Sequence, residues 1–452
     1  MAKFLLDKDT LELIKSLVEK RADKKLIFKL ADVHYADIAE IAESLSIDDA
    51  VYLVKLLDSE KTADALAEID EDFREKILIQ LSAKEIAEEI EELDTDDAAD
   101  LIAELPEERQ EKVMSEISDS EHLKDIRELL TYEENTAGAL MAKELVKVQE
   151  DLSVLRCVND MRAQAEYVTR VHSIYVVNTK NKLIGRLSLK DLLTANSKAK
   201  VKDIYIPKVD FVDVEEDVEE VAKIMSKYDL EAIPVVNNKQ ELLGRITIDD
   251  IVDVIKEEAD KDYQLAAGIS NDVEANDTIF ELSKARLPWL FLGLLGGLGS
   301  VFILKDFETI MTQPRVRSLF FYTPLIAAMA GNVGVQSSAI IVQGLANDVV
   351  KGSLINRLLK EVGLSLINGF FLAVVLIIFG WIMGQELVLS LTVAGSMMGV
   401  IIVAALIGTF VPIILNKRGI DPAIATGPFI TTSNDIFGIY LFFYIAQTFL
   451  EF

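Results

Sequence analysis

The sequence predicts a multidomain membrane protein: a cytosolic α-solenoid, then a duplicated α/β module, then an all-α transmembrane domain of five helices. Three observations support this prediction. A 12-residue repeat fills the first 130 residues, a second repeat with copies 59 residues apart follows it, and five long uncharged stretches end the chain. With 452 residues, half of them apolar, the chain is long enough for several domains.

The 12-residue repeat predicts the first domain, over residues 1–132. An apolar residue recurs at this spacing, and the residue after it is usually Ser or Asp, whose side chains accept hydrogen bonds from free N–H groups at a helix start. Each unit therefore predicts a capped helix of about two and a half turns, and helices this short must stack on one another. The apolar positions are Leu45, Leu57, Ile69, Leu81, Leu93, Leu105 and Ile117, and the capping positions are Ser46, Asp58, Asp70, Ser82, Asp94, Pro106 and Ser118.

The second repeat predicts an α/β module over residues 133–258. Ser173–Arg186 matches Ala232–Arg245, and Val148–Asp151 matches Val214–Asp217. Each copy predicts a strand, a helix, a β-branched strand, a turn with Asn and Lys, a strand and a second helix. The pattern resembles a tandem pair of CBS domains, which pack as one pseudo-symmetric module; the alternative is an unrelated α/β repeat.

The resemblance to CBS pairs implies a possible adenine-nucleotide ligand, because such pairs often bind one. Asp191 and Asp250 stand at matching places in the two copies and are the candidates for contacting a ribose. A Gly-rich phosphate loop, which would support nucleotide binding, is not evident in the sequence.

Five uncharged stretches predict five membrane spans within residues 276–452, since about 20 apolar residues cross a bilayer. With the N-terminal part in the cytosol, seven basic residues flank the inner side and three the outer side, in agreement with the positive-inside rule. An odd number of spans then places the C-terminus outside. The stretches are Leu287–Leu304, Ser318–Asn347, Val362–Gln385, Leu387–Asn416 and Pro422–Leu450.

Charge and cysteine usage exclude several classes of protein. Eight basic and eight acidic residues lie from Leu287 onward, so the whole net charge of −29 lies before it. This acidic part repels nucleic acid and anionic headgroups and suits either solubility or cation binding. The only cysteine, Cys157, excludes a disulfide framework, and three scattered histidines exclude a zinc cluster. The first ten residues do not form a signal peptide, so we expect a cytosolic N-terminal part.

One ionisable residue inside a predicted span points to ion transport. Asp435 lies near the middle of the fifth stretch, where a lone carboxylate costs several kcal/mol and must face water, a cation or a partner. We expect Gly427-Pro428 to loosen this helix and free backbone carbonyls, which are tolerated at that depth only in a cavity. Carbonyls, the Thr431 hydroxyl and a carboxylate make an all-oxygen lining suited to a hard cation.

The second stretch adds amides to this lining. Asn332 and Gln336 are four residues apart, on one helix face, so both amides can point into one cavity; interhelical hydrogen bonding is the alternative. Arg286-Leu-Pro-Trp289 opens the first stretch, and we interpret Trp289 as an anchor at the headgroup level.

An acidic helix just before the membrane predicts a cation sensor. Asp250, Asp253 and Glu257 form one helical stripe, and like charges at this spacing destabilise a helix unless they are neutralised. We expect a bound cation to bridge this stripe to other acidic groups; a solvated acidic face is the alternative. The candidate sensor residues are Asp94, Asp97 (with Asp96 in the same run), Asp213, Glu215, Glu216, Asp229, Asp250, Asp253, Glu257 and Glu258.

Together these features resemble the MgtE family of magnesium channels over essentially the whole chain. The marks are Arg286–Leu290, Gly331–Gln336, Asp421–Ala423 and Gly427–Thr432 followed by Asp435. The resemblance implies a homodimer in the plasma membrane, an ion path along its two-fold axis that passes the residue at the Asp435 position, and a connecting or plug helix over residues 247–275. Val335 departs from the family, whose members often carry a polar residue there.

The prediction is a Mg²⁺-selective channel or transporter that imports Mg²⁺ and is closed by Mg²⁺ bound to its acidic cytosolic domains. Mg²⁺ is implied by the resemblance, since the residue types suit Ca²⁺, Mn²⁺ or Co²⁺ equally. The alternatives are a secondary transporter coupled to H⁺ or Na⁺ and a non-conducting Mg²⁺ sensor. Catalytic residues, a nucleic-acid partner and an obligate protein partner are not expected.

Overall fold

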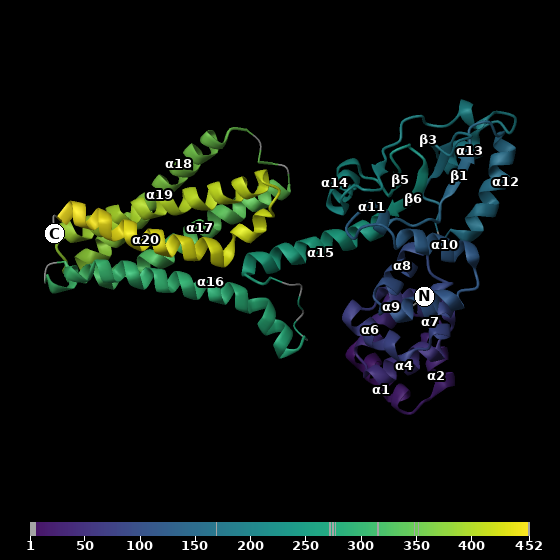
Figure 1. The fold of residues 1–452 in the computed structure, drawn as a ribbon, viewed down its shortest axis with the longest axis horizontal. Coiled ribbons are helices and arrows are strands. Elements are labelled where there is room, and N and C mark those ends of the chain that lie inside the picture. Colours follow the sequence, from purple (N-terminus) through teal and green to yellow (C-terminus); the bar gives the residue numbers. More distant parts are fainter. Residues whose placement is uncertain are drawn as a thin grey trace. The chain divides into compact units, whose positions relative to one another are not determined.

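The computed structural model describes residues 6–168, 170–270, 273, 275, 277–313, 316–347, 349–350 and 352–450 (Figure 1). The chain divides into two compact units, Met1–Lys256 and Glu257–Phe452. Helix α15 (Ile248–Ala267) runs through the boundary between them. Two flanking basic residues used to orient the spans, Arg315 and Lys351, lie outside the described residues.

Within the part of the chain that the structure describes, ten short helices build the start of the first unit, and the last seven follow the 12-residue repeat. Ser46, Asp58, Asp70 and Ser82 each cap a helix through the side chain, because each accepts a hydrogen bond from a backbone N–H in the first turn. The helices are α1 (Lys8–Glu19), α2 (Asp23–Leu30), α3 (Tyr35–Glu43), α4 (Ile47–Leu56), α5 (Ser59–Glu68), α6 (Glu71–Gln80), α7 (Ala83–Ile90), α8 (Thr95–Ala103), α9 (Glu107–Glu116) and α10 (Ser120–Leu129).

The prediction of the last capping residue, Ser118, is wrong by one position. Helix α10 is capped by Asp119, whose carboxylate accepts from the backbone N–H groups of Glu121 and His122. The Ser118 hydroxyl instead donates a hydrogen bond to the carboxylate of Glu91 at 2.6 Å, at the C-terminal end of α7, and does not cap α10.

Two three-stranded sheets follow, one from each copy of the second repeat. In each, the first strand pairs parallel with the second, and the second pairs antiparallel with the third. The strands are β1 (Val146–Gln149), β2 (Ile174–Val177), β3 (Leu183–Leu187), β4 (Val212–Asp213), β5 (Ala232–Val236) and β6 (Leu242–Thr247). The α-helices are α11 (Ala137–Leu140), α12 (Val154–Gln164), α13 (Leu189–Thr194) and α14 (Val218–Tyr228), with short 3₁₀ turns at Ala165–Tyr167 and Val201–Asp203.

Among its described residues, the second unit contains five helices that are long and apolar enough to span a membrane. Helix α20 packs against α16, α17 and α19, and α18 packs against α19. Their buried core includes Phe442 and Phe443 of α20. The helices are α16 (Ile279–Asp306), α17 (Thr323–Ala346), α18 (Leu354–Ile382), α19 (Leu387–Lys417) and α20 (Gly427–Leu450), with 3₁₀ turns at Glu308–Thr312, Arg317–Tyr322 and Pro422–Ala425.

Two boundaries differ from the sequence prediction. The first spanning helix begins at Ile279, so Arg286–Trp289 lies within α16 and does not open it; the capping box formed by Thr278 and Glu281 fixes the earlier start. The fifth stretch is not one continuous helix, because a 3₁₀ turn at Pro422–Ala425 precedes α20.

Candidate ion path and cytosolic cation cluster

Asp435 lies on α20 beside a glycine of α17. It comes eight residues after Gly427, about 12 Å from the start of the helix, and so in its first half instead of near the middle as predicted. The side chain is half-buried. Its Oδ1 atom is 3.6 Å from the point that a Cβ atom on Gly331 would occupy, so the missing side chain at Gly331 leaves this carboxylate room between the helices.

The other predicted pore residues lie on the same two helices. Asn332 and Gln336 are both exposed, one turn apart on α17. We expect the fifth stretch to loosen at Gly427-Pro428, and the break falls at the start of α20, after the 3₁₀ turn at Pro422–Ala425, with Gly427 at a φ of +47°. The Gly427 carbonyl accepts a hydrogen bond from the Thr431 hydroxyl at 2.9 Å.

Close packing of α17, α19 and α20 surrounds this region. A side chain on Gly334 would overlap the amide of Asn434, and one on Gly408 would meet the carbonyl of Gly334. Asn434 is 1% exposed, and neither atom of its amide has a hydrogen-bond partner in the described part of the chain. These contacts fix how closely α17 approaches Asp435.

A cluster of carboxylates forms where α8 meets the duplicated α/β module. Carboxylate oxygens of Asp94, Asp96 and Glu144 lie within 4.8 Å of one another, a spacing that fits shared coordination of one cation. Thr95 links the start of α8 to Glu144, because its backbone N–H and its hydroxyl both donate hydrogen bonds to the Glu144 carboxylate, at 3.2 and 2.8 Å. Asp94 stands at the cap position of α8 but makes no capping bond.

The pKa values of this cluster are raised. Burial, followed by the charge of Glu144, raises the pKa of Asp94 to about 6. Burial raises the pKa of Asp96 well above its ordinary value, with Asp97 and Asp250 adding to the effect. Binding a shared proton or a metal ion therefore stabilises this group of carboxylates, because it offsets their mutual repulsion.

The acidic face continues along α5 and α15. Partial burial and then the nearby charge of Asp253 raise the pKa of Glu68, and burial raises the pKa of Asp64. Sequence reasoning missed Asp64, Glu68 and Glu144. Glu144 lies in an irregular segment before β1 without a repeat position, so only the fold brings it to Asp94.

Of the predicted sensor residues, the structure brings Asp94, Asp97, Asp250 and Asp253 to this face. The others lie elsewhere. Asp213 accepts from the backbone N–H of Glu215 at 3.2 Å in the turn before α14, and Asp229 ends α14 in the left-handed region. Glu258 pairs with Lys261 at 2.9 Å. Glu215 and Asp229 are exposed, Glu216 is half-buried, and Glu257 is exposed.

A second pair of carboxylates brings like charges together, Asp262 on α15 and Asp421 in the segment before α20. Burial and then the charge of Asp421 raise the pKa of Asp262. Near this pair, Pro428 at the start of α20 contacts Gly268, just after α15 ends. The C-terminal end of α15 thus packs against the helix that carries Asp435.

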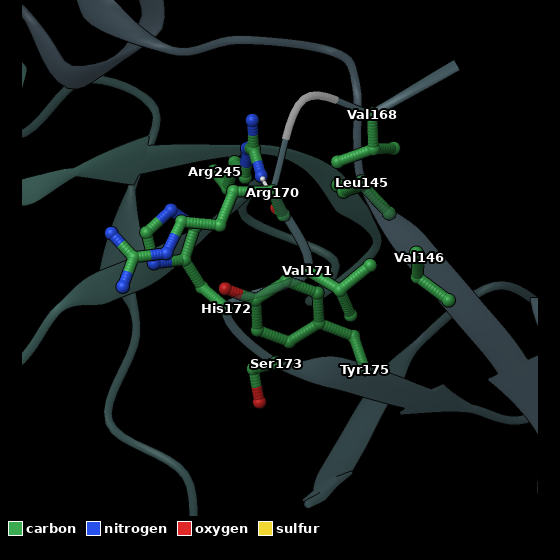
Figure 2. A pocket seen from close by; sticks show the side chains of 9 residues that line it. All are labelled: Leu145, Val146, Val168, Arg170, Val171, His172, Ser173, Tyr175 and Arg245. Carbon is green, nitrogen blue, oxygen red and sulfur yellow. Dashed lines mark hydrogen bonds between the residues drawn. The ribbon is translucent and has the colours of Figure 1, made fainter. Parts of the chain in front are cut away.

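The two nucleotide candidates hold equivalent local bonds. The Asp191 carboxylate accepts from the hydroxyl of Ser188 at 2.6 Å, and that of Asp250 accepts from the hydroxyl of Thr247 at 2.7 Å. A small hollow in the first copy is closed on one side by Arg245 of the second copy (Figure 2). Its lining is Leu145, Val146, Val168, Arg170, Val171, His172, Ser173, Tyr175 and Arg245.

Comparison with known proteins identifies the family. Residues 323–445 match the MgtE family model, described as a divalent cation transporter. Residues 33–135 match the MgtE intracellular N domain, and residues 137–198 and 201–257 match the CBS domain. The magnesium transporter MgtE of Bacillus subtilis (strain 168) is 36% identical over 71% of this chain and 71% of its own length. The chain belongs to the MgtE family.

Other MgtE proteins agree with this assignment. The magnesium transporter MgtE of Thermus thermophilus is 34% identical over 71% of each chain. A crystal structure of the cytosolic domain of the Mg²⁺ channel MgtE in complex with ATP is 30% identical, with a TM-score of 0.51, and covers 54% of this chain and 99% of that one. This member of the MgtE family is therefore a membrane transporter with cytosolic N-terminal domains, and not an enzyme.

Proposed function

We propose that this protein is a homodimeric Mg²⁺ channel that imports Mg²⁺ along a path lined by α17 and α20. The position of Asp435 beside Gly331 carries the proposal, because a carboxylate in a spanning helix is tolerated only where it meets water, a cation or a partner. Asn332, Gln336, Gly427 and Thr431 would add amide, carbonyl and hydroxyl oxygens.

Mg²⁺ fits this lining on chemical grounds. It prefers six oxygen ligands and sheds water reluctantly, so it passes largely hydrated. Two copies of Asp435 across a dimer axis would offset its charge without stripping its water, and the exposed Asn332 and Gln336 offer amides to that water. In this arrangement, the odd number of spans places the C-terminus outside the cell.

The test of transport uses the full-length protein in liposomes that contain a Mg²⁺-sensitive dye. Asp435→Ala should abolish Mg²⁺ uptake while the variant elutes like the native protein. Asp306→Ala, at the exposed end of α16, is the control and should leave uptake unchanged. Native uptake by the Asp435 variant would refute the path.

We further propose that cytosolic Mg²⁺ closes the channel by binding the carboxylates of Asp94, Asp96, Glu144 and Asp250. Without the ion, like charges favour separation of the helical domain from the CBS pair; with it, the two dock. Because Mg²⁺ biases the equilibrium only by its higher affinity for the docked state, several weak sites give a steep response. Helix α15 would pass this change to α20 through the contact of Gly268 with Pro428.

The gating proposal is tested by recording Mg²⁺ current while Mg²⁺ on the cytosolic side is varied. The combined variant Asp94→Asn, Asp96→Asn and Asp250→Asn should conduct but need at least about tenfold more Mg²⁺ to close, the factor that 1.4 kcal/mol of lost binding free energy gives. The Asp213→Asn variant, outside the cluster, is the matched control. An unchanged closing concentration in the triple variant would contradict the proposal.

An adenine nucleotide at the CBS pair is a second proposed ligand. The ATP-bound relative supports it, with Asp191 as the candidate in the first copy and Asp250 in the second. Equilibrium dialysis of full-length protein with ATP tests it, and loss of binding in Asp191→Ala is the expected result.

A further inference from the structure

The two CBS copies place the same Gly-Arg pair in different surroundings. Gly185-Arg186 lies on β3 and Gly244-Arg245 at the matching place on β6. Arg186 is exposed, and within the described residues it forms no ion pair. Arg245 is only 5% exposed. Burying an arginine is costly unless its charge is compensated, so the buried copy needs an explanation that the repeat does not supply.

Arg245 reaches across to the helical domain. Its Nη2 lies 3.6 Å from Oδ2 of Asp94. Its Nη1 donates to the backbone carbonyl of Arg170 at 3.0 Å, and Figure 2 shows these two arginines. Its backbone exchanges two hydrogen bonds with Ala142, at 2.8 and 2.9 Å. The guanidinium is therefore fixed from the CBS side and presented to the start of α8.

The charges around Asp94 explain why a fixed cation belongs there. Asp96 and Glu144 lie against Asp94, and the charge of Asp250 also reaches it. In the part of the chain that the structure describes, Arg245 makes the one ion pair to these four carboxylates. The guanidinium cannot lose its proton in a protein, so this positive charge is permanent. Asp94, diverted to Arg245, leaves the start of α8 without a side-chain cap.

We propose that Arg245 is a resident counter-ion that docks the helical domain onto the CBS pair in the absence of Mg²⁺. Its permanent positive charge offsets one of the four negative charges in the cluster, and the dication compensates the others. This deepens the proposed Mg²⁺ sensing: Arg245 maintains a docked population at zero Mg²⁺, and Mg²⁺ completes the docking.

The test measures the distance between the two domains in full-length protein in detergent. Spin labels on Lys29→Cys in α2 and Lys239→Cys in the β5–β6 turn, both exposed, report docking by pulsed electron paramagnetic resonance. Cys157 stays unlabelled, because it is fully buried and burial raises the pKa of its thiol to about 11. Distances are recorded with a chelator and with saturating Mg²⁺.

Arg245→Met should lower the docked-to-undocked ratio in chelator by about tenfold or more, as expected when one member of a mostly buried ion pair is removed. Saturating Mg²⁺ should restore the docked distance. Arg186→Met, the matched arginine of the first copy, should behave like the native protein. In an Asp94→Asn background, which lacks the partner charge, Arg245→Met should lower the docked ratio by less than it does in the native protein.

Two results would overturn the role of Arg245: a native docked ratio in Arg245→Met with chelator, or native protein that is wholly undocked there. Failure of the Mg²⁺ sensor looks different. In that case Mg²⁺ would leave the distances of native protein and variant unchanged, while the difference between them in chelator would persist.

Discussion

Acidification should replace Mg²⁺ in docking the helical domain onto the CBS pair. The pKa of Asp94 rises from 3.8 to about 6 in the docked state. A group whose pKa is higher in the docked state binds protons more tightly there, so protonation stabilises docking. This stabilisation is complete below the undocked pKa and is lost as the pH rises through about 6, so it falls within the window from about pH 4 to 6.

The magnitude follows from the two pKa values of Asp94. Complete protonation is worth about 3 kcal/mol at 1.36 kcal/mol per pH unit. Because the Asp94 side chain is 31% exposed, solvent screening lowers this to about 2 kcal/mol. Between about pH 7.5 and 5, roughly half of this stabilisation, about 1 kcal/mol, is gained, so the docked-to-undocked ratio should rise about fivefold from Asp94 alone.

The assay is the labelled pair Lys29→Cys and Lys239→Cys in Mg²⁺-free buffer, titrated from about pH 7.5 to 5. Asp94→Asn cannot take up this proton, so its response should be smaller by the same factor, and the remainder should come from Asp96 and its neighbours. A docked ratio that stays constant or falls on acidification would refute the assignment of raised pKa values to the docked cluster.

Two further predictions concern packing. Gly334→Ala should destabilise the membrane helices by about 1–3 kcal/mol and lower the thermal midpoint in detergent, because the new Cβ atom overlaps the Asn434 amide and lies 2.7 Å from Ile430. Arg74→Met should lower the hydrogen-exchange protection of α6 and α8 by about 3–5 kcal/mol. Arg74 forms a buried ion pair with Glu104, and the substitution leaves the Glu104 carboxylate without its partner.

Each packing prediction has a control on the same kind of element. A Cβ atom on Gly363 of α18 meets no atom within 4 Å, so Gly363→Ala should keep the native midpoint, and equal midpoints for the Gly334 and Gly363 variants would contradict the packing account. For Arg74, the control is Lys84→Met, whose pair with Glu88 is exposed. Equal protection in the two variants would show that the Arg74 pair contributes nothing.

Local patterns predicted much of the fold. The caps at Ser46, Asp58, Asp70 and Ser82 follow from a side chain and an N–H group three residues away, and both are visible in the sequence. The uncharged stretches predicted five spanning helices because length and polarity decide insertion. Ser118 failed because its competing partner, Glu91, is 27 residues away.

The site was less predictable, because tertiary contacts decide it. Asp94 occupies a capping position in the repeat, yet its carboxylate serves Arg245, 151 residues later. Arg186 and Arg245 share one motif, and only the fold buries one of them. The nearness of Asp435 to Gly331 depends on how α17 and α20 pack, which the period of each helix alone does not give.

Single-channel recording of the purified protein in planar bilayers, with Mg²⁺ as the only permeant cation, tests the ion path most directly. We expect Mg²⁺ current from native protein, a smaller current from Asp435→Glu, and none from Asp435→Asn, which keeps the size of the side chain but not its charge. Mg²⁺ current of native size through correctly folded Asp435→Asn channels would contradict it.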